Sequence, residues 1–174
     1  MPDILDHIFS RRSIRQYTEQ AVSREDILRL LQAGMAAPSA SNRRPWEFIV
    51  VTDRELLEKL RKGLVFGRYR PPLAIAVCGN MRRALPGPAR DFWIQDCSAA
   101  AQNILLAATG MGLGSVWIGV HPIKPLAKVV ARVLSIPDHV IPLGVIYVGH
   151  PAETKEPRTQ YDESKVSWQR YGGS

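Results

Sequence analysis

The chain has 174 residues, of which 45% are hydrophobic and 22% are charged, and it carries a formal net charge of +7. This length suits a single domain over residues 1–174 with one sizeable core, and the longest apolar runs are far too short to span a bilayer. The N-terminal stretch MPDILDHIFSRR contains no continuous apolar segment. We therefore expect no secretory leader and no membrane helix, and we place the protein in the cytoplasm.

The positive charge is spread along the chain rather than gathered into a nucleic-acid-binding motif. No helix-turn-helix, zinc-finger or aromatic RNA-binding pattern accompanies the arginines, so we expect a small anionic ligand and no nucleic-acid partner. Cys78 and Cys97 lie in apolar segments and are predicted to be buried free thiols. The four histidines form no metal-binding pattern, which argues against a metal site.

The hydrophobic pattern predicts helices and strands that alternate along the chain. Ser23, followed by Asp26, is typical of a helix start, and so is Asp53. In chain order we expect helices over 3–10 and 23–34, a strand over 46–52, a helix over 53–62, a strand over 73–79, an irregular loop over 80–89, the longest helix over 90–109, a strand over 114–120, a helix over 125–134 and a strand over 141–148. This order predicts an α+β layered domain with a mixed sheet.

The C-terminal tail, from about residue 150 to 174, differs in composition from the rest of the chain. Apart from Val166 and Trp168 it has few apolar anchors, so it cannot form a core by itself. We expect it to lie on another surface, and a second subunit would supply one.

The first motif that points to chemistry is RRSIR, residues 11–15. Guanidinium groups donate hydrogen bonds in a fixed fork, and a serine hydroxyl adds a short one, so this segment suits a phosphate group. The same residues also suit the solvated end of a basic helix, where the helix dipole favours cations. The motif alone leaves both interpretations open.

Two further motifs follow, each with a structural alternative. In APSASNRRPWEF, residues 37–48, the short side chains of Ser39, Ser41 and Asn42 suit a polyol or the edge of a heterocycle, although an ordinary turn has the same composition. In GLGSVWIG, residues 112–119, glycines flank an apolar strand without matching a dinucleotide fingerprint or a P-loop. They let a flat ligand approach the backbone, and tight helix–strand packing explains them equally well.

Taken in order, these motifs resemble the nitroreductase family of FMN-dependent oxidoreductases. The matching stretches are RRSIRQY at 11–17, APSASNRRPWEFIVV at 37–51, DCSAAAQNILLAATGMGLGSVWIG at 96–119, VGHPAE at 148–153 and SWQRYGG at 167–173. The resemblance covers almost the whole chain. It implies a layered α/β/α homodimer with a mainly antiparallel sheet, in which FMN lies at the subunit interface and the tail wraps the partner subunit.

The resemblance also implies which residues bind FMN. One subunit would hold the phosphate and pyrimidine side, and the partner's loop would border the ring and the ribityl chain, while the strand after the longest helix would form a wall near the flavin. The implied cofactor-binding residues are Arg11, Arg12, Ser13, Arg15 and Arg158 on the first side, Pro38, Ser39, Ala40, Ser41, Asn42 and Arg44 in the loop, and Trp117, Ile118 and Gly119 in the wall. Lys155 is the second choice for the basic tail residue.

By the same resemblance, NADH or NADPH would reduce the flavin and a small, flat acceptor such as a nitroaromatic, a quinone or a flavin would reoxidise it in a ping-pong cycle. No protein acid or base is demanded, because the flavin carries the chemistry. A narrower flavin enzyme, such as a dehalogenase, or a flavin-storage protein would share the same motifs. Arg44 is a departure, since the family often has Gln before the Pro-Trp pair; a fixed cation there would favour the anionic reduced flavin.

Overall fold

The computed structural model of the protein describes residues 3–173. Its helices are α1 (Ile4–Ser10), α2 (Arg24–Met35), α3 (Arg54–Gly63), α4 (Phe92–Gly110) and α5 (Lys124–Leu134). Its strands are β1 (Trp46–Val51), β2 (Leu73–Asn80), β3 (Gly114–Gly119) and β4 (Val140–Gly149), and short 3-10 turns lie at η1 (Ala40–Asn42), η2 (Gly87–Ala89) and η3 (Glu163–Lys165). Every helix and strand expected from the sequence is present, with ends that differ by at most two residues.

The helix starts follow the predicted capping chemistry. The Ser23 hydroxyl accepts a hydrogen bond from the Asp26 amide at 3.0 Å and donates to the Asp26 carboxylate at 2.8 Å. At the start of α3, Asp53 accepts from the Leu56 amide at 2.9 Å. Each cap satisfies an amide that the first helical turn leaves unpaired, which fixes where the helix begins.

The sheet is four-stranded, in the order β1-β2-β4-β3, and all its neighbouring strands pair antiparallel. The expectation of a mainly antiparallel sheet is confirmed, but the parallel component is not. Within residues 3–173, parallel pairing is confined to an isolated bridge between Ser13 and Ser115, outside the strand pairs of the sheet. Strands β1 and β3 form the two edges of the sheet.

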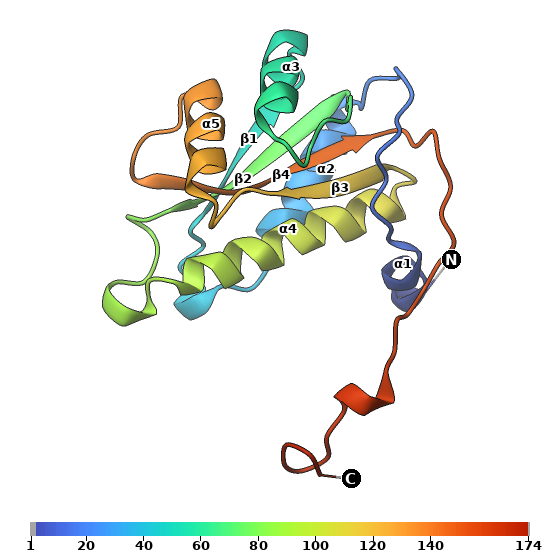
Figure 1. Ribbon diagram of the computed structural model, residues 1–174, viewed down its shortest axis with the longest axis vertical. Helices are drawn as coiled ribbons and strands as arrows, with labels where there is room; N and C mark the ends of the chain where they lie inside the picture. The colour runs from blue at the N-terminus through green and yellow to red at the C-terminus, as the bar shows by residue number, and fades with distance from the viewer. Residues whose placement is uncertain (1–2, 174) are drawn as a thin grey trace.

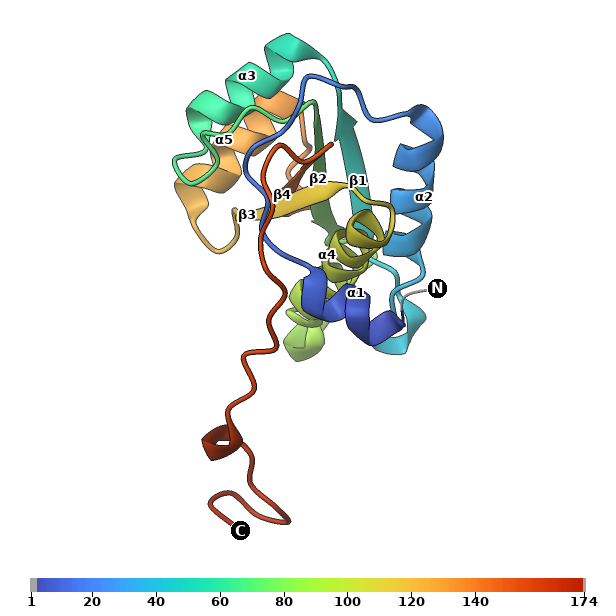
Figure 2. The ribbon, with the colours of Figure 1, turned by 90° about the vertical axis from the view of Figure 1, so that its right-hand side faces the viewer.

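Helices cover both faces of this sheet, which confirms the α+β layered fold (Figure 1). Helices α2 and α4 pack on one face and α3 and α5 on the other, as the view turned by 90° also shows (Figure 2). The central strand β2 is buried along its whole length. Alternate residues face opposite sides: Ile75 packs among the α2 and α4 residues, and Ala76 among those of α3 and α5.

Both cysteines lie in this core, as predicted. Cys78 and Cys97 are buried free thiols, and the Cys97 sulfur lies 3.5 Å from the Cys78 carbonyl oxygen. Burial raises the pKa of the Cys78 thiol to about 12, so this thiol stays protonated at neutral pH. Between residues 3 and 173, no helix is both long and apolar enough to cross a bilayer.

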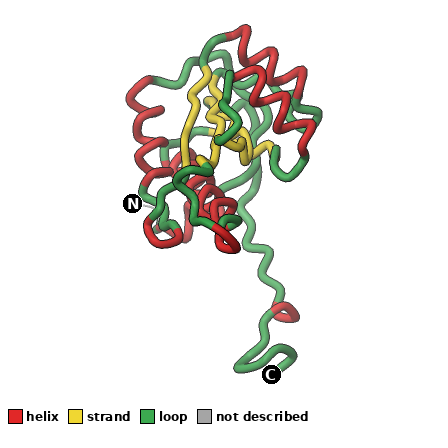
Figure 3. Tube along the Cα trace, turned by 90° about the vertical axis from the view of Figure 1, so that its left-hand side faces the viewer, coloured by secondary structure: helices red, strands yellow, loops and turns green. Residues whose placement is uncertain are grey.

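The tail after β4 leaves the body of the domain. It first runs back along the N-terminal segment and then extends away from it, with η3 as its one short helical turn in the described residues (Figures 1 and 3). Its apolar side chains are exposed: Val166 is 41% accessible and Trp168 is 65% accessible.

Candidate functional site

The segment that follows α1 lies along the free edge of β3. The Ile14 amide donates to the Ser115 carbonyl at 2.9 Å, next to the parallel bridge between Ser13 and Ser115. Gly114 allows this approach, because a Cβ atom there would lie 2.6 Å from an Ile14 side-chain carbon. The contact places residues 11–15 beside the strand that contains Trp117, Ile118 and Gly119.

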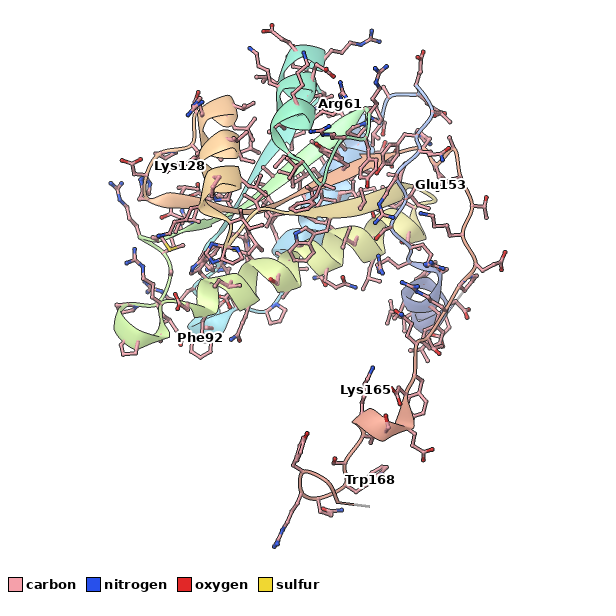
Figure 4. All side chains as sticks on the ribbon, viewed as in Figure 1. Arg61, Phe92, Lys128, Glu153, Lys165 and Trp168 are labelled. Atoms are coloured by element: carbon pink, nitrogen blue, oxygen red, sulfur yellow. The ribbon has the colours of Figure 1, made fainter. Side chains whose placement is uncertain are left out.

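The first residues of the tail pack against the other side of residues 13–16. The Ala152 amide donates to the Gln16 carbonyl at 2.9 Å. The Glu153 carboxylate accepts from the Arg15 amide at 2.5 Å and from the Gln16 amide at 3.3 Å, and Lys155 donates to the Ser13 carbonyl at 2.6 Å. Figure 4 labels Glu153 where the chain leaves β4, beside the N-terminal segment.

These contacts explain the electrostatics of Glu153. The hydrogen bond from the Arg15 amide, followed by the Lys155 ammonium, lowers the pKa of this carboxyl below its usual value. Sequence reasoning quoted Glu153 within a motif and gave it no role. No local sequence pattern marks Glu153, because its hydrogen-bond partners lie about 138 positions earlier in the chain.

Three guanidinium groups gather where α1 meets the tail. The Arg158 amide donates to the Phe9 carbonyl at 3.1 Å, and the Arg12 side chain donates to the Glu156 carbonyl. Burial, and then repulsion from Arg12 and Arg158, lowers the pKa of Arg11. No carboxylate between residues 3 and 173 forms an ion pair with any of the three. We call Arg11, Arg12 and Arg158 the arginine cluster; its uncompensated charge favours an anion.

A pocket of about 270 Å³ opens along β3 next to Arg15. Its lining residues are Arg15, Phe66, Val116, Trp117, Ile118, Gly119, His121 and Ile123. A Cβ atom on Gly119 would meet no atom within 4 Å, so the backbone there is open to a ligand. Because Ser115 directs its carbonyl outward to Ile14, the alternate residues Trp117 and Gly119 present their backbone groups at the same free edge.

Four lining residues of this pocket were not among the predicted site residues: Phe66, Val116, His121 and Ile123. Phe66 and His121 bring aromatic rings to it. Phe66 is 61% exposed in the loop after α3, and the His121 ring packs edge-on against Trp93 with centroids 4.9 Å apart. Neither residue belongs to a motif that the sequence pattern singles out. Their position follows from how the loops after α3 and β3 fold back over the sheet.

The loop before β1 is held in one conformation. The buried Asp96 accepts from the Ala40 amide at 2.8 Å, and the Ser39 hydroxyl accepts from the Arg44 amide at 2.9 Å. Ser41, Asn42 and Arg44 have φ near +50°, a region that residues with side chains rarely adopt. The Ser41 and Asn42 side chains thus sit on a constrained backbone and are exposed, whereas Ser39 is half-buried.

The predicted site residues therefore fall into two groups. Arg11, Arg12, Ser13, Arg15, Trp117, Ile118, Gly119 and Arg158 lie along the β3 edge and the adjoining end of α1. Pro38, Ser39, Ala40, Ser41, Asn42 and Arg44 precede β1, at the opposite edge of the sheet. Three strand spacings, about 14 Å, separate the two edge strands, so one chain does not bring the groups together.

Comparison with known proteins identifies relatives over nearly the whole chain. The sequence profile of the nitroreductase family matches residues 8–65 and 61–150. A protein of Methanothermobacter thermautotrophicus, provisionally named as an NADH dehydrogenase/NAD(P)H nitroreductase, is 43% identical over 172 residues, which cover 97% of this chain and 88% of that one. An FMN reductase (NADPH) of Bacillus subtilis is 34% identical over 91% of this chain and 70% of its own length.

Solved structures share the fold as well. The FMN-dependent nitroreductase of Clostridium difficile R20291 superposes with a TM-score of 0.86 at 33% identity. The match covers 95% of this chain and 99% of that structure's chain. The layered arrangement around the β3 edge is therefore one that is also found in an experimentally solved protein.

Proposed function

Because the chain belongs to the nitroreductase family, we propose that it is an FMN-dependent oxidoreductase that transfers electrons from NADH or NADPH to a flat acceptor. Nitroaromatics, quinones and free flavins are the acceptor classes that the proposal includes. The observation that carries it is the arginine cluster, which lies without counter-charges at one end of the open β3 edge.

The described residues fit FMN in charge and in shape. Arg11, Arg12 and Arg158 would hold the phosphate, because guanidinium groups bind phosphate through paired, charge-assisted hydrogen bonds. The outward-facing backbone groups of Trp117 and Gly119 would bond the edge of the flavin ring. Bound FMN supplies the two-electron chemistry that no side chain of the protein provides.

We further propose that the site is completed by a second copy of the chain. The loop at residues 38–44 is rigid and polar yet lies at the wrong edge of the sheet to reach the arginine cluster of its own chain. Exposed apolar residues of α1 and of the tail need a partner surface; among them Ile4 is 61% and Trp168 is 65% accessible. A homodimer in which the tail wraps the partner would bury these side chains and bring the partner's loop to the β3 edge.

The ping-pong order remains part of the proposal. The β3 pocket offers one open wall, formed by Phe66, Gly119 and His121, which nucleotide and acceptor would use in turn. These residues orient a flat ligand and exclude water. The proposal assigns no proton transfer to the protein.

The decisive experiment combines flavin binding with rapid mixing. We expect the purified protein to bind FMN and the yellow colour to bleach on mixing with NADH or NADPH. Arg158→Gln should weaken FMN binding about tenfold, since it removes one charge-assisted contact, and Arg132→Gln, an exposed arginine on α5, should leave it unchanged. Flavin that binds but is bleached by neither nucleotide would indicate a storage protein, and equal binding by both variants would refute the phosphate site.

A further inference from the structure

We propose that a second pocket, beside the loop at residues 39–44, binds the phosphate-bearing adenosine end of NADPH, so that this protein prefers NADPH to NADH. The inference rests on the proposed function and deepens it, because it names the donor. The pocket has a volume of about 660 Å³ and is lined by Arg43, Arg44, Arg82 and Arg83, with Ser41 and Asn42 beside them. We call these four the second arginine group.

The second arginine group has no counter-charge on the protein. None of its four guanidinium groups forms an ion pair with a carboxylate of residues 3–173. Glu47, on the adjoining strand β1, accepts instead from the Asn80 side chain at 2.6 Å. Four cations around one pocket repel one another, and a ligand with several negative charges relieves that repulsion.

The backbone that carries these arginines is fixed. Asn80, only 8% exposed, accepts from the Arg82 amide through its side chain at 2.9 Å and from the Arg83 amide through its carbonyl at 3.0 Å. The Arg43 side chain donates to the Arg83 carbonyl at 2.8 Å, which ties the two segments together. The main chain that carries Arg82 and Arg83 is therefore held in place before any ligand arrives, which lowers the entropic cost of binding.

The lining also distinguishes a nucleotide from a simple anion. Met35, which is 54% exposed, and the edge of Trp46 add an apolar wall on which a flat base can pack. Unlike NADH, NADPH carries a phosphate on the adenosine ribose, and this group is the one that the pocket would bind. Arginine binds such groups through two parallel hydrogen bonds, so four arginines match the extra charge of NADPH.

This pocket lies next to the proposed flavin site. It shares Ser41, Asn42 and Arg44 with the loop that would border the flavin of the other copy. A dinucleotide held here by its ribose phosphate starts at the margin of the flavin site, with its nicotinamide end free to extend toward the ring.

The test uses the FMN-loaded protein and leaves the flavin-bordering loop intact. We expect the double variant Arg82→Gln/Arg83→Gln to raise KM for NADPH about tenfold, equivalent to about 1.4 kcal/mol, and to change KM for NADH less than twofold. A charge-matched control, Arg90→Gln/Arg132→Gln, removes two exposed arginines outside the pocket and should change neither constant. Calorimetry with adenosine 2′,5′-bisphosphate should show about the same tenfold loss in the first variant only.

Each outcome separates this inference from the proposed function. Unchanged KM for NADPH in a variant that still binds FMN and is still reduced would overturn the inference alone, as would an equal rise for both nucleotides. Salt-sensitive binding of an oligonucleotide through the same arginines, with no binding of the bisphosphate, would overturn it in favour of nucleic acid. Failure to bind FMN at all would refute the proposed function, and the calorimetric result would still test the pocket.

Discussion

One carboxylate joins the start of the tail to the segment that follows α1. Glu153 bonds the main chain of Arg15 and Gln16 and lies 3.3 Å from the Lys155 ammonium. It thereby sets the course of the segment that carries the arginine cluster. A hydrogen bond between a charged group and a neutral partner contributes more to the free energy of unfolding than one between two neutral groups. We therefore expect the Glu153 carboxylate to stabilise the fold.

We predict that Glu153→Gln lowers the free energy of unfolding by about 1–3 kcal/mol at pH 7. The pKa of Glu153 is lowered in the folded protein from its usual value of 4.5, so its contribution is present above that pH and is lost as the pH falls through the folded-state pKa. The difference between variant and wild type in urea unfolding should therefore shrink below pH 4.5. Glu156→Gln, at an exposed neighbouring position, is the control. A difference in unfolding free energy between Glu153→Gln and wild type that is the same at pH 7 and below pH 4.5 would contradict the prediction.

Arg44 carries the second prediction at this scale. Its amide is held by Ser39 and its side chain is exposed at the margin of the proposed flavin site. A cation there stabilises the reduced, anionic flavin, but solvent limits an exposed interaction to less than about 1 kcal/mol. We expect Arg44→Gln to lower the two-electron potential of bound FMN by about 10–20 mV, measured by spectroelectrochemistry. An unchanged or higher potential would refute this role.

At the scale of elements, strands β3 and β4 contain two paired glycines, one in a packed position and one in an open position. Gly119 and Gly144 are partners in the register of this pair. A Cβ atom on Gly144 would lie 2.2 Å from the Trp117 ring nitrogen and 3.0 Å from the Ile118 carbonyl, whereas one on Gly119 would meet nothing. The two glycines are therefore needed for different reasons.

Alanine substitutions at the two positions should give opposite results. Gly144→Ala overpacks the strand against Trp117, and we expect it to lower the free energy of unfolding by about 1–3 kcal/mol. Gly119→Ala should change it by less than about 0.5 kcal/mol, while its methyl group hinders the flavin and weakens FMN binding. Urea unfolding and an FMN titration measure both effects, and Gly119→Ala with wild-type affinity for FMN would place the flavin elsewhere.

At the scale of the whole molecule, the tail beyond Arg158 extends away from the body of the domain (Figure 1). All helices α1–α5 and strands β1–β4 precede it, and only its first residues contact the body. Its side chains beyond Arg158 are exposed, including Tyr161 at 73% and Trp168 at 65%. This arrangement agrees with a segment that packs on a second copy.

We predict that a chain ending after Gln160 keeps its helical and strand content by circular dichroism but is monomeric by light scattering, and that it loses FMN. In the intact protein, dimer formation should bury Trp168 and shift its fluorescence to shorter wavelength, which subtraction of a Trp168→Phe spectrum isolates. A truncated chain that remains dimeric and yellow would show that other surfaces build the site.

The expectations that the structure and the comparisons confirm depend on local signals. Ser23 and Asp53 mark helix starts because the cap and its amide lie three residues apart. The nitroreductase motifs likewise stand in continuous stretches of the chain, and the family match covers those between residues 8 and 150. The expected parallel pairing of strands, by contrast, is limited to one isolated bridge. Strand order and direction depend on how the connections cross the sheet, and the hydrophobic periodicity of the sequence does not indicate this.

The sequence by itself determined the helices, the strands, the buried thiols and the family, since each follows from periodicity, capping or contiguous motifs. Only the tertiary structure decided that Glu153 holds Arg15, that Arg43 bonds the Arg83 carbonyl, and that the two groups of predicted flavin residues lie at opposite edges of the sheet. These pairings join residues from about 40 to 138 positions apart. Contacts of that kind arise from the packing of whole elements, and no local pattern of residues encodes them.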